Sequence, residues 1–180
     1  MTQPPAFPHD TLRITDVTLT LFRWTGLPPV TYTRNSTGGS GECNIGLVTI
    51  HTDAGIDGHA FLGSSFRPVD IDARGFIDNL KPLVMGENPL DRDRLHAALM
   101  TQNRSVMFRP IGAMDVALWD IAGKVAGLPI HRLLGTRRDS LPAYASSATL
   151  KTVEDYVAQA LYSKAAGYRA YKMHPPKDRA

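Results

Sequence analysis

The sequence has almost no cysteine. Cys43 is the single cysteine among 180 residues, so the chain cannot form an internal disulfide and lacks the thiolate clusters of structural zinc sites. Such a composition is typical of a protein in a reducing compartment, and it predicts a cytoplasmic location.

Long apolar runs and blocks of one charge are also missing. The first ten residues are rich in proline and polar side chains and lack the pattern of a signal peptide, so we expect a disordered tail over residues 1–10 and no membrane anchor. The 20 basic and 17 acidic residues are scattered, with a net charge of +3 and no basic cluster typical of nucleic-acid binding. A hydrophobic share of 43% indicates a globular protein.

Alternation of apolar and polar residues predicts three β-strands. The pattern covers residues 12–22, 45–52 and 56–62. Gly55 lies between the last two and can take the positive φ that a short hairpin loop requires. We therefore expect a three-stranded antiparallel sheet. The polar segment 25–42, between the first two strands, is too long for a plain connector and predicts a functional loop.

Helical spacing of apolar residues follows over residues 70–80, 91–100 and 110–126. Pro110 suits the first turn of the last helix, and Gly127 is placed to end it. The predicted buried face of this helix consists of Met114, Ala117, Leu118, Ile121 and Val125.

A polar linker at residues 136–140 predicts a domain boundary, with a first domain over 11–135 and a second over 141–180. The second opens with a predicted strand (141–146), helix (153–166) and strand (168–174), which is a βαβ unit with a parallel strand pair. The side chains expected to point inward from this helix are Val153, Tyr156, Val157, Ala160 and Leu161.

Lys172 and His174 are the strongest candidates for chemistry. They lie two residues apart at the end of the last predicted strand, so their side chains should point to the same side. The carboxyl edge of parallel strands is where barrel enzymes do chemistry. The spacing by itself favours an incidental pair that leads into Pro175 and Pro176, because such pairs are common.

Other candidates are weaker. His51 and His59 flank the hairpin, but no third ligand has metal spacing. Asp120 and Lys124 are four residues apart on one helix and predict an ion pair without a chemical role, while Asp115 lies on a different face.

Two adjacent segments carry a resemblance to a known family. Residues 112–124 (GAMDVALWDIAGK) and 127–135 (GLPIHRLLG) look like the signature of the mandelate racemase and muconate lactonising enzyme family, within the enolase superfamily. The order of elements also fits. The resemblance implies an α+β capping domain (three-stranded antiparallel sheet plus helices) followed by the first βαβ unit of an incomplete (β/α) barrel.

Family members remove the proton α to a carboxylate, and a divalent metal, usually magnesium, stabilises the enediolate. The family often carries Lys-x-Lys at the end of the second barrel strand, and Lys172, Met173 and His174 match it here. The resemblance implies that His174 is the base, because an imidazole with a pKa near ~6.5 needs less tuning than a lysine near ~10.4. Lys172 would then hold the substrate carboxylate; the reverse assignment stays open.

The resemblance also implies that the loop 25–42 and the turn 63–67 close over the barrel and select the substrate. Tyr32, Arg34 and Asn35 offer donors and acceptors suited to a hydroxylated acid, which favours dehydration of an aldonate or aldarate sugar acid. Racemisation, epimerisation and cycloisomerisation within the same family remain alternatives.

After Gly135 the chain has room for two strands and one helix, whereas a full barrel needs about 250 residues. We therefore expect no metal ligands within this chain, magnesium only in the complete enzyme, and no turnover by the chain alone. The family implies a homo-oligomer that acts on a small hydroxy or sugar acid. A hypothesis of another class is a non-catalytic capping or assembly module.

Overall fold

A computed structural model describes residues 11–26, 42–64 and 68–175. The predicted tail over residues 1–10 lies outside them. The described residues form two compact units, the first chiefly over residues 11–23, 44–64 and 68–136 and the second chiefly over residues 137–175. Within the described residues, no helix has the length and apolar character needed to cross a membrane.

The first unit contains a sheet with the strand order β1-β2-β3, made of β1 (Ile14–Thr25), β2 (Glu42–Thr52) and β3 (Gly58–Gly63). β2 and β3 are antiparallel, with Val48 opposite Ala60 and Ile50 opposite Gly58. Gly55 has a φ of +70° in the turn between them, as its position predicts. The predicted three-stranded antiparallel sheet is confirmed.

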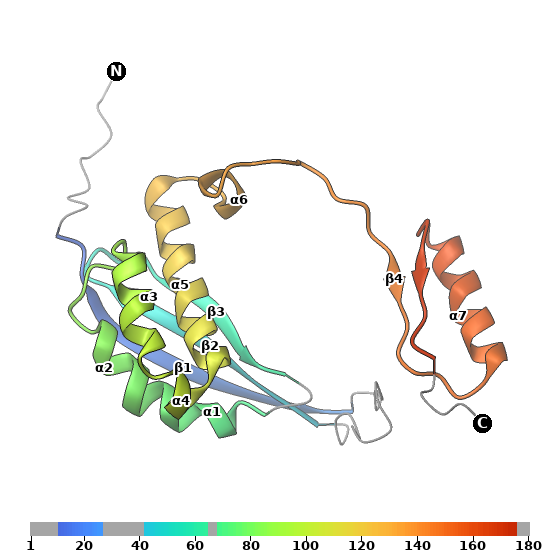
Figure 1. Ribbon diagram of the computed structural model, residues 1–180, viewed down its shortest axis with the longest axis horizontal. Helices are drawn as coiled ribbons and strands as arrows, with labels where there is room; N and C mark the ends of the chain where they lie inside the picture. Colours follow the sequence, from blue (N-terminus) through green and yellow to red (C-terminus); the bar gives the residue numbers. More distant parts are fainter. Residues whose placement is uncertain (1–10, 27–41, 65–67, 176–180) are drawn as a thin grey trace. The chain divides into compact units, whose positions relative to one another are not determined.

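Helices cover one face of this sheet (Figure 1). The helices of the first unit are α1 (Asp70–Gly75), the π-helical turn η1 (Phe76–Leu80), α2 (Lys81–Val84), α3 (Arg92–Met100), α4 (Asn103–Val106), α5 (Phe108–Ala126) and α6 (Ile130–Leu133), and of these α6 lies beyond the end of α5 rather than on the sheet. The helix predicted over 70–80 is therefore longer and changes its hydrogen-bonding pattern midway. The short helices α4 and α6 have too few apolar repeats to be predicted from periodicity.

The long helix α5 packs directly against β3. The predicted stripe is confirmed, since Met114, Ala117, Leu118 and Ile121 are fully buried and Val125 packs partly buried against them. Gly127 ends the helix with a φ of +64°, the left-handed conformation expected there. The predicted start at Pro110 is wrong by two residues, because α5 begins at Phe108.

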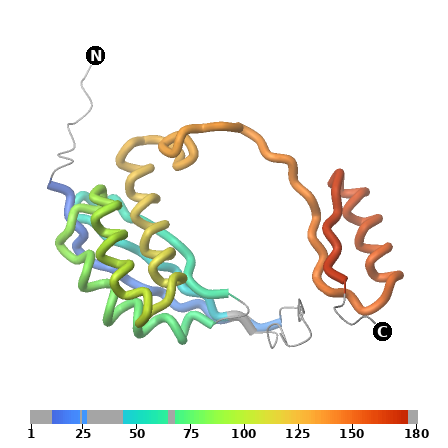
Figure 2. The backbone as a smooth tube through the Cα atoms, viewed as in Figure 1, coloured from blue at the N-terminus to red at the C-terminus, as the bar shows by residue number. Residues whose placement is uncertain are grey.

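The second unit contains β4 (Ala145–Ser146), α7 (Val153–Ala165) and β5 (Tyr171–Lys172), and β4 and β5 are parallel. In Figure 2, α7 lies beside the two strands. Both strands are shorter than predicted. Tyr168 does not belong to a strand because its N–H donates to the carbonyl of Ser163 at 3.1 Å, while Gly167 donates to Lys164 at 3.0 Å; this pattern is a Schellman cap of α7.

The predicted inward face of α7 is largely wrong. Val153, Val157 and Leu161 are more than half exposed, and only Tyr156 of the predicted set is buried. Seven residues after Tyr156, Ser163 is buried as well. The helix has two stripes at helical spacing, and the buried one contains hydroxyl groups. The hydroxyl of Tyr156 bonds to the carbonyl of His174, whereas that of Ser163 donates to the carbonyl of Gln159 within α7.

The close packing of β3 on α5 predicts a strong effect of adding one methyl group at Gly58. A Cβ at this position would meet the carbonyl oxygen of Ala117 and lie 2.6 Å from Cγ1 of Ile121. We expect Gly58→Ala to lower the free energy of unfolding by about 1–3 kcal/mol, measured by urea denaturation.

Gly112 on α5 provides the matched control. A Cβ added to Gly112 would meet no atom outside its own stretch of helix within 4 Å, so Gly112→Ala should raise the stability by about 0.5–1 kcal/mol through helix propensity. Equal effects of the two substitutions would contradict the close approach of β3 to α5.

Candidate active site

The two parallel strands of the second unit are held together by a short hydrogen-bond ladder. Ala145 lies opposite Tyr171, and Ser146 lies opposite Lys172. The ladder continues with the bond from the N–H of Ser147 to the carbonyl of Lys172 at 2.9 Å. The carboxyl ends of both strands therefore lie at the same edge.

Lys172 lies on the face of the strand pair that points away from α7. The hydroxyl of Tyr171 donates to Oε1 of Gln159 on α7 at 2.7 Å, so Tyr171 faces the helix. Successive residues of a strand point to opposite faces, which places Lys172 on the other side. Its Nζ lies 6.0 Å from the centre of the Tyr144 ring, a weak cation–π contact on that face.

His174 follows β5 directly and is tied to the neighbouring strand. Its backbone N–H donates to Oγ of Ser147 at 3.0 Å, and its ring Nδ1 lies 2.6 Å from the carbonyl oxygen of Ser147. Ser147 is only 1% exposed. The carbonyl of His174 accepts a hydrogen bond from the hydroxyl of Tyr156 at 2.6 Å.

Tyr156 and the start of α7 were not predicted to support this site. Tyr156 appeared in the sequence only as an inward-facing aromatic residue, whereas its hydroxyl also accepts from the N–H of Leu150 at 2.9 Å. Thr152 and Asp155 form a reciprocal capping box at the start of α7. A threonine followed three residues later by an acidic residue predicts the beginning of a helix from the sequence, although this pattern does not predict the contacts of Tyr156.

The structure places Lys172 in β5 and His174 two residues further along the chain, at the carboxyl end of the strand. That their side chains point to the same side stays a prediction. Their roles stay predictions. The proposed substrate residues Tyr32, Arg34 and Asn35 lie outside the described residues, as does most of the turn 63–67.

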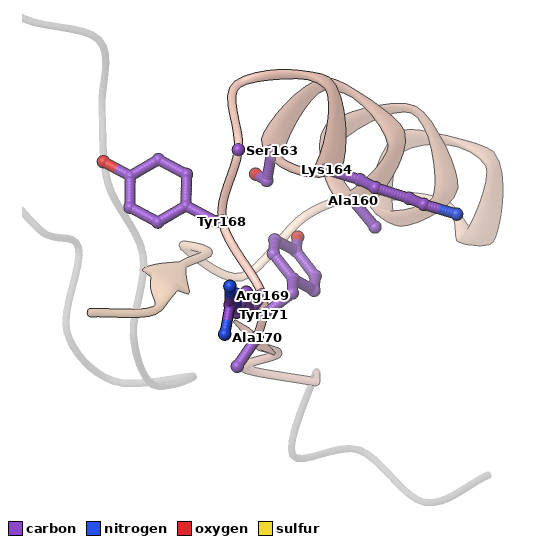
Figure 3. A pocket seen from close by; sticks show the side chains of 8 residues that line it. Ala160, Ser163, Lys164, Tyr168, Arg169, Ala170 and Tyr171 are labelled. Atoms are coloured by element: carbon purple, nitrogen blue, oxygen red, sulfur yellow. The ribbon is translucent and has the colours of Figure 1, made fainter. Parts of the chain in front are cut away.

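The second unit also has a hollow of about 490 Å³, shown in Figure 3. Its walls come from the end of α7 and the segment that leads into β5, including Lys164, Tyr168 and Arg169. The hollow therefore lies at the amino end of β5. We place the candidate chemistry at the carboxyl end, because Lys172 and His174 are there and parallel-sheet enzymes bind ligands at that edge.

His51 and His59, which flank the predicted hairpin, make different side-chain contacts. His51 contacts Asp57 through Nδ1 at 3.0 Å and Thr18 through Nε2 at 3.3 Å. His59 instead lies beside Lys124, with 3.2 Å between Nδ1 and Nζ. Across the described ranges, no three histidine, cysteine, aspartate or glutamate side chains come together as a metal site.

The predicted ion pair on α5 is confirmed. Nζ of Lys124 lies 2.7 Å from Oδ2 of Asp120 and also donates to the carbonyl of Asp57 at 2.6 Å. Asp120 in turn accepts from the backbone N–H of His59 at 2.8 Å. These bonds fasten α5 to the amino end of β3. Asp115, on another face, lies 3.4 Å from Nδ1 of His96.

Comparison with known proteins identifies the family. The family model of the mandelate racemase / muconate lactonizing enzyme N-terminal domain matches residues 15–135. The chain belongs to this family. The match spans the antiparallel sheet and the helices that cover it, which are the capping domain of mandelate racemase / muconate lactonizing enzymes, and the parallel pair β4–β5 is consistent with the start of their barrel.

Relatives of this family include sugar-acid dehydratases. A D-galactonate dehydratase family member from Catenulispora acidiphila is 30% identical over 178 residues, which cover 96% of this chain and 37% of the relative. An L-talarate/galactarate dehydratase from Salmonella typhimurium, solved with magnesium and L-lyxarohydroxamate, has a TM-score of 0.74 at 26% identity and is matched over 96% of this chain and 47% of its own.

A D-glucarate dehydratase from Agrobacterium tumefaciens, solved with magnesium, has a TM-score of 0.70 at 27% identity. The match covers 91% of this chain and 44% of that one. The chain therefore spans less than half the length of these mandelate racemase / muconate lactonizing enzyme relatives.

The contacts of Asp120 predict a pH dependence of stability. Burial by itself raises the pKa of Asp120, but the hydrogen bonds from Lys124 and from the backbone of His59 outweigh it and hold the pKa below its usual 3.8. A lowered pKa means that ionised Asp120 stabilises the fold above its ordinary pKa, and that this contribution is lost as the pH falls through the folded-state value.

We expect Asp120→Asn to reduce the free energy of unfolding at pH 7 by about 1 kcal/mol, because the partly exposed ion pair is screened by solvent. The difference from the parent chain should shrink below about pH 4 in urea denaturation. Asp93→Asn, at an exposed position of α3, is the control. An unchanged penalty at acid pH would show that the charge of Asp120 is not the cause.

Proposed function

We propose that the complete enzyme is a sugar-acid dehydratase in which His174 takes the proton α to the substrate carboxylate. The observation that carries this proposal is the placement of Lys172 and His174 at the carboxyl end of β5. Lys172 lies on the face away from α7. In a (β/α) barrel the helices are outside, so this face is the one directed to the interior.

Lys172 supplies a positive charge for the substrate carboxylate, and His174 supplies the base. Once His174 has accepted the α-proton, the electron pair left on the substrate expels the β-hydroxyl group. The departing hydroxyl takes up one proton and leaves as water, and the imidazolium of His174 gives up the proton that it accepted, so that the net reaction is the loss of one water molecule. The resulting enol becomes a 2-keto-3-deoxy acid. A neutral imidazole suits this task because its unprotonated ring nitrogen can accept a proton.

Magnesium belongs to the complete enzyme in this proposal, where it would stabilise the negative charge that develops on the substrate. Two dehydratases of similar structure were solved with magnesium. We place its ligands outside the described residues of this chain, and we expect the chain alone to show no turnover.

The test completes the barrel by joining this chain to the remaining residues of the Catenulispora acidiphila relative. Dehydration of a panel of aldonates and aldarates is then measured with magnesium. We expect His174→Asn to lower kcat by about 10²–10⁴-fold, because asparagine cannot accept the proton. His131→Asn, at an exposed position of α6, should leave the rate unchanged.

Lys172→Met separates the two possible assignments. If Lys172 binds the carboxylate, this variant mainly raises KM. A loss of kcat in Lys172→Met together with an active His174→Asn would reverse the roles. No dehydration of any sugar acid, together with interconversion of epimers, would instead identify a racemase or epimerase.

A further inference from the structure

The contact between His174 and Ser147 determines which ring nitrogen carries the proton. Nδ1 lies 2.6 Å from the carbonyl oxygen of Ser147, and a carbonyl oxygen can only accept a hydrogen bond. Nδ1 must therefore be the donor. In the neutral ring this leaves the basic lone pair on Nε2.

Tyr156 holds the backbone on both sides of this contact. Its hydroxyl donates to the carbonyl of His174 at 2.6 Å and accepts from the N–H of Leu150 at 2.9 Å. Leu150 belongs to the loop that follows β4, so one buried hydroxyl joins that loop to the end of β5. Tyr156 itself is 9% exposed.

Two further constraints act on the same residue. Oγ of Ser147 accepts from the backbone N–H of His174 at 3.0 Å. Pro175 follows His174, and a residue before proline is restricted to extended conformations. The backbone of His174 is thus fixed at its N–H, at its carbonyl and by its neighbour, which keeps Nδ1 within reach of the Ser147 carbonyl.

We propose that Tyr156 and Ser147 are positioning residues that hold His174 with its proton on Nδ1, so that Nε2 is the nitrogen that receives the substrate proton. This inference rests on the proposed function, because it assigns an atom to the step proposed for His174. Neither residue touches the reacting atoms. They act through the orientation and the tautomer of the imidazole.

Tyr171 offers a matched comparison within the same unit. Its hydroxyl also joins a strand to α7, through Gln159 at 2.7 Å, but that bond does not involve His174. A role limited to fastening α7 to the strands would make Tyr156→Phe and Tyr171→Phe equivalent. A positioning role makes only Tyr156→Phe change the state of the His174 ring.

The experiment measures the ring nitrogens of His174 by ¹⁵N NMR in the full chain, without metal or substrate. The pH is held near ~8.5, where an imidazole is neutral, and His174→Gln identifies the signals. We expect an excess of about tenfold of the Nδ1–H over the Nε2–H tautomer, the ratio that one hydrogen bond of ordinary net strength supports. Tyr156→Phe should reduce this ratio about threefold or more, and Tyr171→Phe should not.

A dominant Nε2–H tautomer in the parent chain would overturn the proposal, as would an unchanged ratio in Tyr156→Phe. If the amide protons of Ala145 and Ser147 lose their protection from hydrogen exchange in Tyr156→Phe, the strand pair has opened and Ser147→Ala is used instead, because it removes only the hydroxyl acceptor. A tautomer ratio in Ser147→Ala equal to that of the parent chain would again overturn the proposal. These signals do not depend on turnover. An inactive proposed function and a wrong tautomer are therefore distinguishable.

Discussion

The hydrogen bonds that join β4 to β5 place Lys172 and His174 at one edge of a parallel strand pair. The strands are short, and the ladder extends only from the bond between Ala145 and the carbonyl of Ala170 to the bond between Ser147 and the carbonyl of Lys172. Ser147 then contacts His174 with its hydroxyl and its carbonyl. The position of both candidate residues depends on this small set of polar contacts, since much of the apolar surface of α7 faces away from the strands.

The first unit is held together differently. Its core is a set of fully buried apolar side chains between the sheet and α5, and the approach is close enough that β3 needs a glycine at position 58. Polar groups at the edge of this core, such as the Asp120–Lys124 pair, help to fix the position of α5 relative to β3. The family match, over residues 15–135, covers this unit.

Strong periodicity made much of the fold predictable. The predicted buried face of α5 was correct because five apolar positions repeat on one face and a glycine ends the helix. The predicted buried face of α7 was wrong, because Val153, Val157 and Leu161 form a second apolar stripe and periodicity alone does not say which stripe meets the strands. The length of β5 was overestimated because Tyr168 has strand propensity but serves in the cap of α7.

Part of the candidate site could likewise be predicted from the sequence, and part could not. Lys172 and His174 could be found from their spacing and from the family motif, since both are properties of neighbouring residues. The contacts of Tyr156 could not, because a hydroxyl bond to the backbone of a residue 18 positions away depends on how the helix packs.

Loss of a deuterium label from the α-carbon of the substrate tests proton abstraction by His174 most directly. A sugar acid deuterated at the α-carbon is incubated with magnesium and the completed barrel in ordinary water, and release of the label is followed by NMR and mass spectrometry. We predict release with the parent sequence and none above background with His174→Asn. Release that persists in His174→Asn would contradict the assignment of His174 as the base.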